Sequence, residues 1–280
     1  MKTIDCGQIK EAVAGLCPKA NLYLPKDVSQ SIKDALVAER SPLGQTILAD
    51  ILKNHAVAGE EALPLCQDTG LAVVFIELGQ DVHITGGLLT DAVNQGIAQG
   101  YTEHYLRKSV VAHPFKRTNT GDNTPAIIHT QLCAGDNLKI TLMPKGGGAE
   151  NYSALAMLTP AQGLEGAKEF IIEAIHKAGP NACPPYIIGV GIGGNFELAP
   201  LLAKKALGRT IGQHHPLADI AQLEYELLQA ANNLNIGPQG LGGHTTALNI
   251  AIEIHPCHIA SLPVAVNINC HVGRHQSITL

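Results

Sequence analysis

Apolar residues along the chain predict a helical N-terminal segment, followed by strands that alternate with helices. They recur at helical spacing within the first 55 residues, where Ser41 suits an N-cap and Pro42 suits the first helical position. The nearly unbroken apolar run Leu71–Leu78 is typical of a buried strand. Near the end of the chain, Leu248–Ile254 and Leu262–Ile268 each place large aliphatic residues at every second position, as half-buried strands do.

Periodicity and turn-forming residues predict further elements between these segments. Helices are expected over residues 87–105, 160–178, 196–206 and 217–234, and strands over residues 126–132, 138–143 and 186–192. The first two of these strands are expected to form a hairpin around Gly135-Asp136. The pattern predicts an α/β fold of mixed α+β type, with mixed sheets flanked by helices. We expect one domain over residues 1–280, with a division into two subdomains near residues 144–160.

Composition and charge narrow the functional classes. Lys and Arg number 19 against 24 Asp and Glu, so the formal net charge is −5, and aromatic residues make up only 4%. This balance argues against nucleic-acid binding. No apolar run reaches the roughly 18 residues of a membrane span, and Asp5, Lys10 and Glu11 lie where a signal peptide has its apolar core. We therefore expect a cytoplasmic protein that binds neither nucleic acid nor a membrane.

The seven cysteines are candidates for metal binding, because cytoplasmic cysteines are thiols or ligands before they are disulfides. Cys66, Cys183 and Cys270 share a context, each at a strand edge or loop beside glycine, proline or asparagine. Their spacings of 117 and 87 residues do not fit a local zinc knuckle. Buried structural thiols are one interpretation. The other is a [4Fe–4S] cluster with three thiolate ligands and one iron open to substrate.

Two glycine-rich segments are candidates for ligand binding, and the sequence around them supports only the first. Lys145-Gly146-Gly147-Gly148 combines a cation with exposed backbone N–H groups, which suits a carboxylate or phosphate, although a flexible connector is the alternative. Gly189–Gly194 matches the G-x-G-x-x-G dinucleotide fingerprint and follows a predicted strand. The second strand and the acidic residue expected about 20 positions later are missing. A nucleotide-binding or structural module therefore remains only a remote alternative.

Six ordered motifs make the chain similar to the alpha subunit, or N-terminal half, of class I (iron–sulfur) fumarate hydratases. The similarity runs from about residue 40 to residue 276. The motifs are Cys66–Gly70, Lys145–Gly148, Asn181–Pro185, Gly189–Gly194, Ile236–Gly240, and His255–His258 with the strand that leads to Cys270.

The resemblance implies a role for each candidate site residue. Cys66, Cys183 and Cys270 resemble the three ligands of a substrate-binding [4Fe–4S] cluster, which the glycine-rich loops would surround. Asp68 resembles the residue that takes part in proton transfer. The implied substrate contacts are Gln67, Arg107, the backbone N–H groups of Gly147 and Gly148, and His258.

The resemblance also implies a reaction and a partner. We expect a hydro-lyase that reversibly hydrates fumarate to L-malate, a small dicarboxylate reaction. Gly193–Glu197 and His255–His258 favour this branch. A tartrate or methyl-substituted dicarboxylate dehydratase alpha subunit is the alternative. Similar single-chain proteins continue into a second domain, which here is either a separate polypeptide or a part missing from a fragment. We expect a separate beta subunit, a hetero-oligomer, and activity only when both chains are present.

Overall fold

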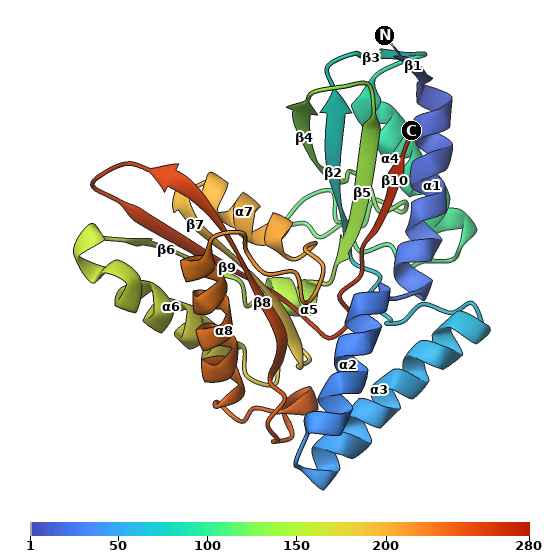
Figure 1. Cartoon of the computed structure of the whole chain (residues 1–280). Helices are drawn as coiled ribbons and strands as arrows, with labels where there is room; N and C mark the ends of the chain where they lie inside the picture. Colours follow the sequence, from blue (N-terminus) through green and yellow to red (C-terminus); the bar gives the residue numbers. More distant parts are fainter. Residues whose placement is uncertain (1) are drawn as a thin grey trace. The chain divides into compact units, whose positions relative to one another are not determined.

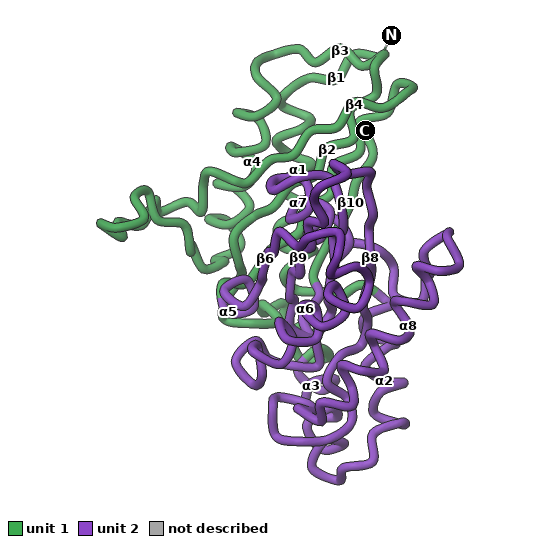
Figure 2. The backbone as a smooth tube through the Cα atoms, turned by 90° about the vertical axis from the view of Figure 1, so that its left-hand side faces the viewer, with its two compact units in different colours: residues 1–25, 55–147, 274–280 green, residues 26–54, 148–273 purple. Residues whose placement is uncertain are grey.

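The computed structural model describes residues 2–280, which divide into two compact units (Figure 2). Unit 1 comprises residues 2–25, 55–147 and 274–280, and unit 2 comprises residues 26–54 and 148–273. Each unit contains a four-stranded mixed sheet with helices against it. The predicted α/β fold with mixed sheets flanked by helices is therefore confirmed.

The N-terminal segment is helical, as predicted, after one short strand. Its elements are β1 Lys2–Asp5, α1 Cys6–Leu22, α2 Lys26–Ala38 and α3 Pro42–Glu60. Asp5 and Gln8 form a capping box that fixes the start of α1. Ser41 Oγ accepts the N–H of Gly44 at 3.2 Å, so it caps α3 as expected. None of the helices within residues 2–280 combines the length and the apolar character that crossing a membrane requires.

The sheet of unit 1 has the strand order β10-β5-β2-β4. The remaining elements of this unit are β2 Leu71–Gly79, β3 Val82–Thr85, α4 Leu89–Glu103, β4 Ile127–Cys133, β5 Leu138–Lys145 and β10 Gln276–Thr279. Strand β2 pairs parallel with β4 and antiparallel with β5, so the predicted hairpin of residues 126–143 is wrong. The reason is burial: β2 is the more apolar strand and takes the central place, while β4 is largely exposed at the edge.

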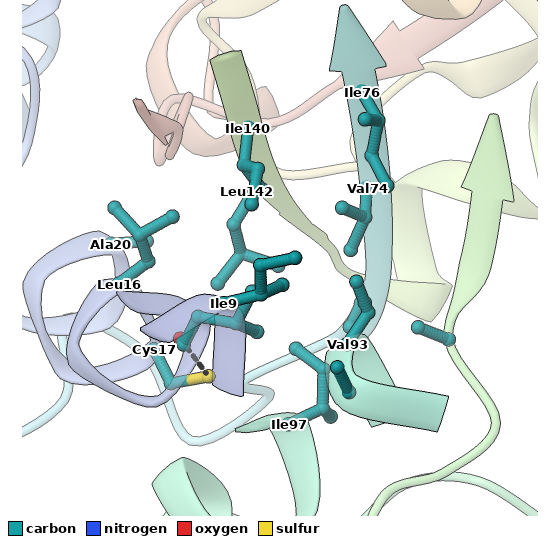
Figure 3. Close-up of a cluster of buried hydrophobic side chains, with 14 of the residues drawn as sticks. Ile9, Leu16, Cys17, Ala20, Val74, Ile76, Val93, Ile97, Ile140 and Leu142 are labelled. Carbon is teal, nitrogen blue, oxygen red and sulfur yellow. Dashed lines mark hydrogen bonds between the residues drawn. The ribbon is translucent and has the colours of Figure 1, made fainter. Parts of the chain in front are cut away.

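The core of unit 1 lies between its sheet and helices α1 and α4. Figure 3 shows Ile9 and Leu16 of α1 and Val93 of α4 with Val74 and Leu142 of the sheet, all of them buried. Every second residue of β2 contributes to this core, because alternate side chains of a strand point to one face.

The sheet of unit 2 has the strand order β6-β9-β7-β8. In chain order the elements are α5 Gly147–Glu150, β6 Ala154–Leu158, η1 Pro160–Gln162, α6 Gly163–Ala178, β7 Tyr186–Gly194, α7 Leu198–Ala206, α8 Ala218–Asn232, η2 Pro238–Gly240, β8 Ala247–Cys257 and β9 Leu262–Asn269. Helices α6 and α8 cover one face of the sheet and α7 covers the other (Figure 1). Helix α5 begins with the last residue of unit 1.

The G-x-G-x-x-G stretch in β7 is explained by packing against α7. A Cβ on Gly189 would lie 2.0 Å from the carbonyl oxygen of Ala203, and one on Gly191 would lie 2.1 Å from that of Ala199. Only glycine permits so close an approach of helix and strand. The motif therefore has a structural role that needs no nucleotide.

Candidate functional site

The Cys66–Gly70 turn enters the central strand of unit 1. Strands β2 and β5 pair with Leu71 opposite Lys145, which places the turn beside the segment that follows Lys145. Gly70 has a φ of +77°, and a Cβ there would lie 2.7 Å from the backbone nitrogen of Lys145. Glycine is required at this position for both reasons. Two of the predicted site motifs thus lie side by side.

Both carboxylate oxygens of Asp68 accept backbone N–H groups. Oδ1 accepts the N–H of Gly70 at 2.9 Å, and Oδ2 accepts the N–H of Gly147 at 2.8 Å. The side chain is half-buried. Its orientation is therefore fixed by two hydrogen bonds, while part of it faces solvent. In this structure the N–H of Gly147 donates to Asp68, and the contact of this N–H with a substrate carboxylate stays a prediction.

A buried cation supports the same turn. The Arg274 side chain donates from Nη2 to the carbonyl oxygen of Asp68 at 2.7 Å and from Nη1 to Oδ1 of Asn21 at 3.2 Å. Only 2% of Arg274 is exposed. Sequence reasoning missed this residue, although an arginine after a predicted strand of a candidate site was a usable signal.

Two further side chains hold the next carbonyl groups. The Tyr101 hydroxyl donates to the carbonyl oxygen of Thr69 at 2.7 Å, and Nδ2 of Asn123 donates to that of Gly70 at 3.2 Å. Both side chains are fully buried. Burial raises the pKa of the Tyr101 hydroxyl, so it stays protonated and remains a donor. Sequence reasoning missed both residues, since neither differs visibly from a core tyrosine or a loop asparagine.

The predicted substrate contacts of unit 1 are accessible. Gln67 is exposed next to Asp68, and Arg107 is exposed in the segment after α4. The hydroxyl of Thr69 donates to the carbonyl oxygen of Arg107 at 2.8 Å, which anchors the Arg107 backbone to the turn. Unit 1 therefore gathers a fixed carboxylate and the backbone of a cationic residue on one loop cluster.

In unit 2, Cys183 and Cys270 lie on adjacent segments. Cys183 precedes β7, Cys270 follows β9, and these antiparallel strands pair with Ile187 opposite Asn269. The N–H of His271 donates to the carbonyl oxygen of Cys183 at 3.3 Å. The side chain of Cys183 is exposed and that of Cys270 is half-buried. The sheet thus presents both thiols at one end.

The thiol environments separate candidate ligands from structural cysteines. Cys17 is fully buried and its Sγ donates to the carbonyl oxygen of Val13 at 3.3 Å (Figure 3). Burial raises the pKa of Cys17 to about 12, which keeps this thiol protonated. Cys6 is also buried, and its pKa is raised. Cysteines of this kind pack the core, so the buried-thiol interpretation applies to them.

The donor chemistry of Cys66, Cys183 and Cys270 fits iron–sulfur ligation. Cys66 and Cys270 are half-buried and Cys183 is exposed, and none of the three forms a disulfide. Their sulfur atoms are therefore available as iron ligands. Among residues 2–280, neither unit gathers three metal-binding side chains of its own. Cys66 belongs to unit 1 and the other two belong to unit 2. A cluster held by all three stays a prediction.

His258 lies at the opposite end of its sheet from Cys183 and Cys270. It is exposed in the connection that leads from β8 to the start of β9, and its Nδ1 accepts the N–H of Ala260 at 3.1 Å. The eight residues of β9 separate this connection from Cys270 by about 25 Å. The structure therefore does not bring His258 together with Cys183 and Cys270, the two proposed ligands in its own unit.

A buried carboxylate fixes the glycine-rich loop that begins at Asn235. Oε1 of Glu39 accepts the N–H of His244 at 3.0 Å, and Oε2 accepts the N–H of Thr245 at 2.8 Å. Oε1 also accepts the N–H of Ser41 at 3.0 Å. Burial alone would raise the pKa of Glu39, but these backbone hydrogen bonds outweigh it and lower the pKa to about 2. Sequence reasoning predicted only helices within the first 55 residues and missed Glu39.

Replacing Tyr101 by phenylalanine tests the support of the Cys66–Gly70 turn. Tyr101→Phe removes the hydroxyl that donates to the carbonyl oxygen of Thr69 and leaves this buried carbonyl without that hydrogen bond. The unfolding free energy should fall by about 1–2 kcal/mol, as measured by equilibrium unfolding in urea. Tyr105→Phe is the matched control, because Tyr105 is 91% exposed. Equal effects of the two variants would contradict the assigned role of Tyr101.

Replacing Glu39 by glutamine tests the carboxylate that holds the glycine-rich loop. A pKa of about 2 in the folded chain, against an ordinary value of 4.5, means that the ionised form stabilises the fold above about pH 4.5. This contribution is lost as the pH falls from about 4.5 to about 2. The difference in unfolding free energy between wild type and Glu39→Gln should be about 3 kcal/mol at pH 7 and should shrink below pH 4.5.

Urea unfolding between pH 7 and pH 3 measures this difference. Glu169→Gln is the control, because Glu169 is an exposed carboxylate of α6 in the same unit. Its effect should stay within about 0.5 kcal/mol of wild type. A Glu39→Gln difference that does not change with pH would show that the carboxylate charge is not the source of the stabilisation.

Comparison with known proteins identifies the family. A family described as fumarate hydratase (Fumerase) matches residues 10–279. A Methanocaldococcus jannaschii protein named "Putative L(+)-tartrate dehydratase subunit alpha" is 42% identical over 273 residues, which cover 95% of this chain and 95% of the relative. The L(+)-tartrate dehydratase subunit alpha of Escherichia coli strain K12 is 32% identical over 275 residues, which cover 97% of this chain and 90% of the relative. The family match and the coverage of nearly the whole chain lead to one conclusion: the chain belongs to the fumarate hydratase (Fumerase) family.

Proposed function

We propose that this chain is the alpha subunit of an iron–sulfur-dependent dicarboxylate dehydratase, a hydro-lyase, with L(+)-tartrate as its substrate. The names of the relatives support tartrate better than fumarate, which sequence reasoning preferred. The description of the family supports hydration of fumarate to L-malate as the second candidate. Both reactions add or remove water across two adjacent carbons of a four-carbon dicarboxylate.

The observation that carries the proposal is the geometry of Asp68. Its carboxylate is held by the N–H groups of Gly70 and Gly147, two residues after the thiol of Cys66. A half-buried carboxylate with a fixed orientation suits general acid–base catalysis, which depends on a positioned group. The backbone of Arg107 is tied to the same turn, so a cation for a substrate carboxylate belongs to this loop cluster.

The proposed chemistry of the chain follows from this arrangement. Elimination of water requires removal of a proton from one carbon and departure of hydroxide from the next. The free edge of the Asp68 carboxylate would exchange the carbon-bound proton, and Arg107 and Gln67 would bind the substrate carboxylates. From tartrate, the elimination gives an enol that becomes oxaloacetate. We assign His258 no contact with a substrate bound near Cys183 and Cys270 of the same chain, because the length of β9 separates it from them.

We propose Cys66, Cys183 and Cys270 as the ligands of a [4Fe–4S] cluster. When bound, such a cluster supplies a Lewis-acidic iron that can neutralise the charge of a departing hydroxide. The exposed or half-buried thiols of these three residues support the proposal. The backbone N–H of Gly148, where a Cβ would meet nothing within 4 Å, is proposed to face a substrate carboxylate.

The proposed assembly contains a second polypeptide. The relatives are named as alpha subunits, which supports a separate beta subunit and a hetero-oligomer. Residues 1–280 would then act as one alpha domain whose activity requires that partner.

Replacing the proposed ligands tests the cluster. After anaerobic reconstitution with iron and sulfide, the wild-type chain should turn brown and absorb broadly in the visible range. Cys66→Ser, Cys183→Ser and Cys270→Ser should each lose most of this absorption, because serine does not replace a thiolate on iron. The iron and sulfide content per chain measures how much cluster each variant holds.

Cys257→Ser is the control for reconstitution, because Cys257 is an exposed thiol outside the proposed set. It should reconstitute like wild type. A wild-type chain that stays colourless, or three ligand variants that reconstitute normally, would rule out the proposed cluster.

Activity with the reconstituted alpha–beta complex tests the substrate and Asp68. We expect dehydration of L(+)-tartrate to exceed hydration of fumarate in kcat/KM, and Asp68→Asn to lower kcat at least about 100-fold with the cluster retained. Oxaloacetate and L-malate formation measure the two reactions. Faster turnover of fumarate would assign the second candidate, and a fully active Asp68→Asn would remove Asp68 from the chemistry.

A further inference from the structure

One residue donates two hydrogen bonds to the carbonyl group of Pro184, the residue that follows Cys183. The carbonyl oxygen of Pro184 accepts the backbone N–H of Gln239 at 2.8 Å and its side-chain Nε2 at 3.0 Å. Both acceptor positions of this carbonyl are therefore occupied by Gln239. Ile236–Gly240 belongs to the motifs of the sequence resemblance, and neither the cluster nor the substrate proposal assigns it a role.

The other peptide groups around Cys183 are fixed as well. Cys183 has a φ of +53°, a conformation that residues other than glycine adopt only when their surroundings support it. Its N–H donates to the carbonyl oxygen of Pro180 at 3.4 Å, and its carbonyl oxygen accepts the N–H of His271 at 3.3 Å. The backbone of this residue is held on both sides, while its thiol side chain is exposed.

Gln239 is itself held in place. It has a φ of +53° within the 3₁₀ turn η2, and the loop around it closes through the N–H of Gly242, which donates to the carbonyl oxygen of Ile236 at 2.9 Å. The N–H of Gly237 donates to Oγ1 of Thr246 at 3.2 Å. The Glu39 carboxylate holds the C-terminal part of the same loop. The backbone of the loop that contains Gln239 is therefore fixed by hydrogen bonds on both sides of this residue.

We propose that Gln239 is a positioning residue for the Cys183 thiolate. It holds the Pro184 carbonyl, which keeps Cys183 in its left-handed conformation and leaves its thiol exposed, where it would be available to a cluster. This inference rests on the proposed function, because it treats Cys183 as a cluster ligand. Replacing a residue that orients a metal ligand through a hydrogen bond commonly lowers metal affinity 10- to 100-fold.

Gln239→Met tests the proposal, because methionine has a similar length and lacks the amide donor. The backbone N–H of residue 239 remains available to Pro184, so the loop keeps one of its two hydrogen bonds. In the reconstituted chain, the visible absorption should bleach about 10-fold faster than wild type in an iron chelator. In the metal-free chain, the amide of His271 should exchange with solvent about 10-fold faster, because the carbonyl that accepts it loosens.

Gln229→Met is the matched control, since Gln229 is an exposed glutamine of α8 in the same unit. It should change neither the bleaching nor the exchange rate. Wild-type rates in Gln239→Met would overturn the inference. Equally accelerated exchange throughout β7 and β9 would also overturn it, because Gln239 would then support the whole fold instead of the ligand. A Cys183→Ser variant with a normal cluster would instead refute the proposed function, so the two failures are distinguishable.

Discussion

The pairing of β2 with β5 is the constraint on which the candidate site of unit 1 depends. Leu71 lies opposite Lys145, so the turn that ends at Gly70 and the segment that starts at Gly146 leave the sheet together. The hydrogen bond from Gly147 to Asp68 follows directly from this register. A shift of one residue would turn every side chain of β2 to the other face and separate the two loops. The burial of β2 on the α1–α4 core therefore also sets the position of the carboxylate.

A similar relation between sheet and loops holds in unit 2. The antiparallel pairing of β7 with β9 places the residue before one strand beside the residue after the other, which are the segments of Cys183 and Cys270. The glycines of β7 allow α7 to pack closely on one face, and the large aliphatic residues between them face α6 and α8. Strand β7 therefore has two roles. Its alternating glycine and aliphatic residues pack against helices on both faces of the sheet, and its first residues position the segment that contains Cys183.

Much of this arrangement could be predicted from the sequence, and the failures have physical causes. The apolar run Leu71–Leu78 and the cap at Ser41 gave correct elements because they act locally. The hairpin of residues 126–143 failed because strand partners depend on which strand is buried most, a property of the whole sheet. Strands such as β1 and β10, with four residues each, are too short to show a period.

The candidate site divides in the same way. Cys66 and Asp68 could be chosen as candidates from the sequence because they lie two residues apart in a distinctive turn, and their roles stay predictions. Tyr101 and Arg274 were not, because each acts on a turn that lies far away in the sequence. Their role is a hydrogen bond to a main-chain carbonyl, which any residue could present. Supporting residues of this kind leave no local pattern, so only the folded chain identifies them.

Exposure, more than residue type, separates the two fixed carboxylates of this chain. Asp68 and Glu39 each accept backbone N–H groups on both carboxylate oxygens, so main-chain donors hold both side chains. Glu39 is only 2% exposed, so its charge serves the loop alone, whereas Asp68 is half-buried and keeps part of its carboxylate available. Glu224, by contrast, forms an ion pair with Arg209 and is fully engaged within the fold. A carboxylate that is fixed by main-chain donors yet still accessible combines the orientation and the free lone pairs that proton transfer requires.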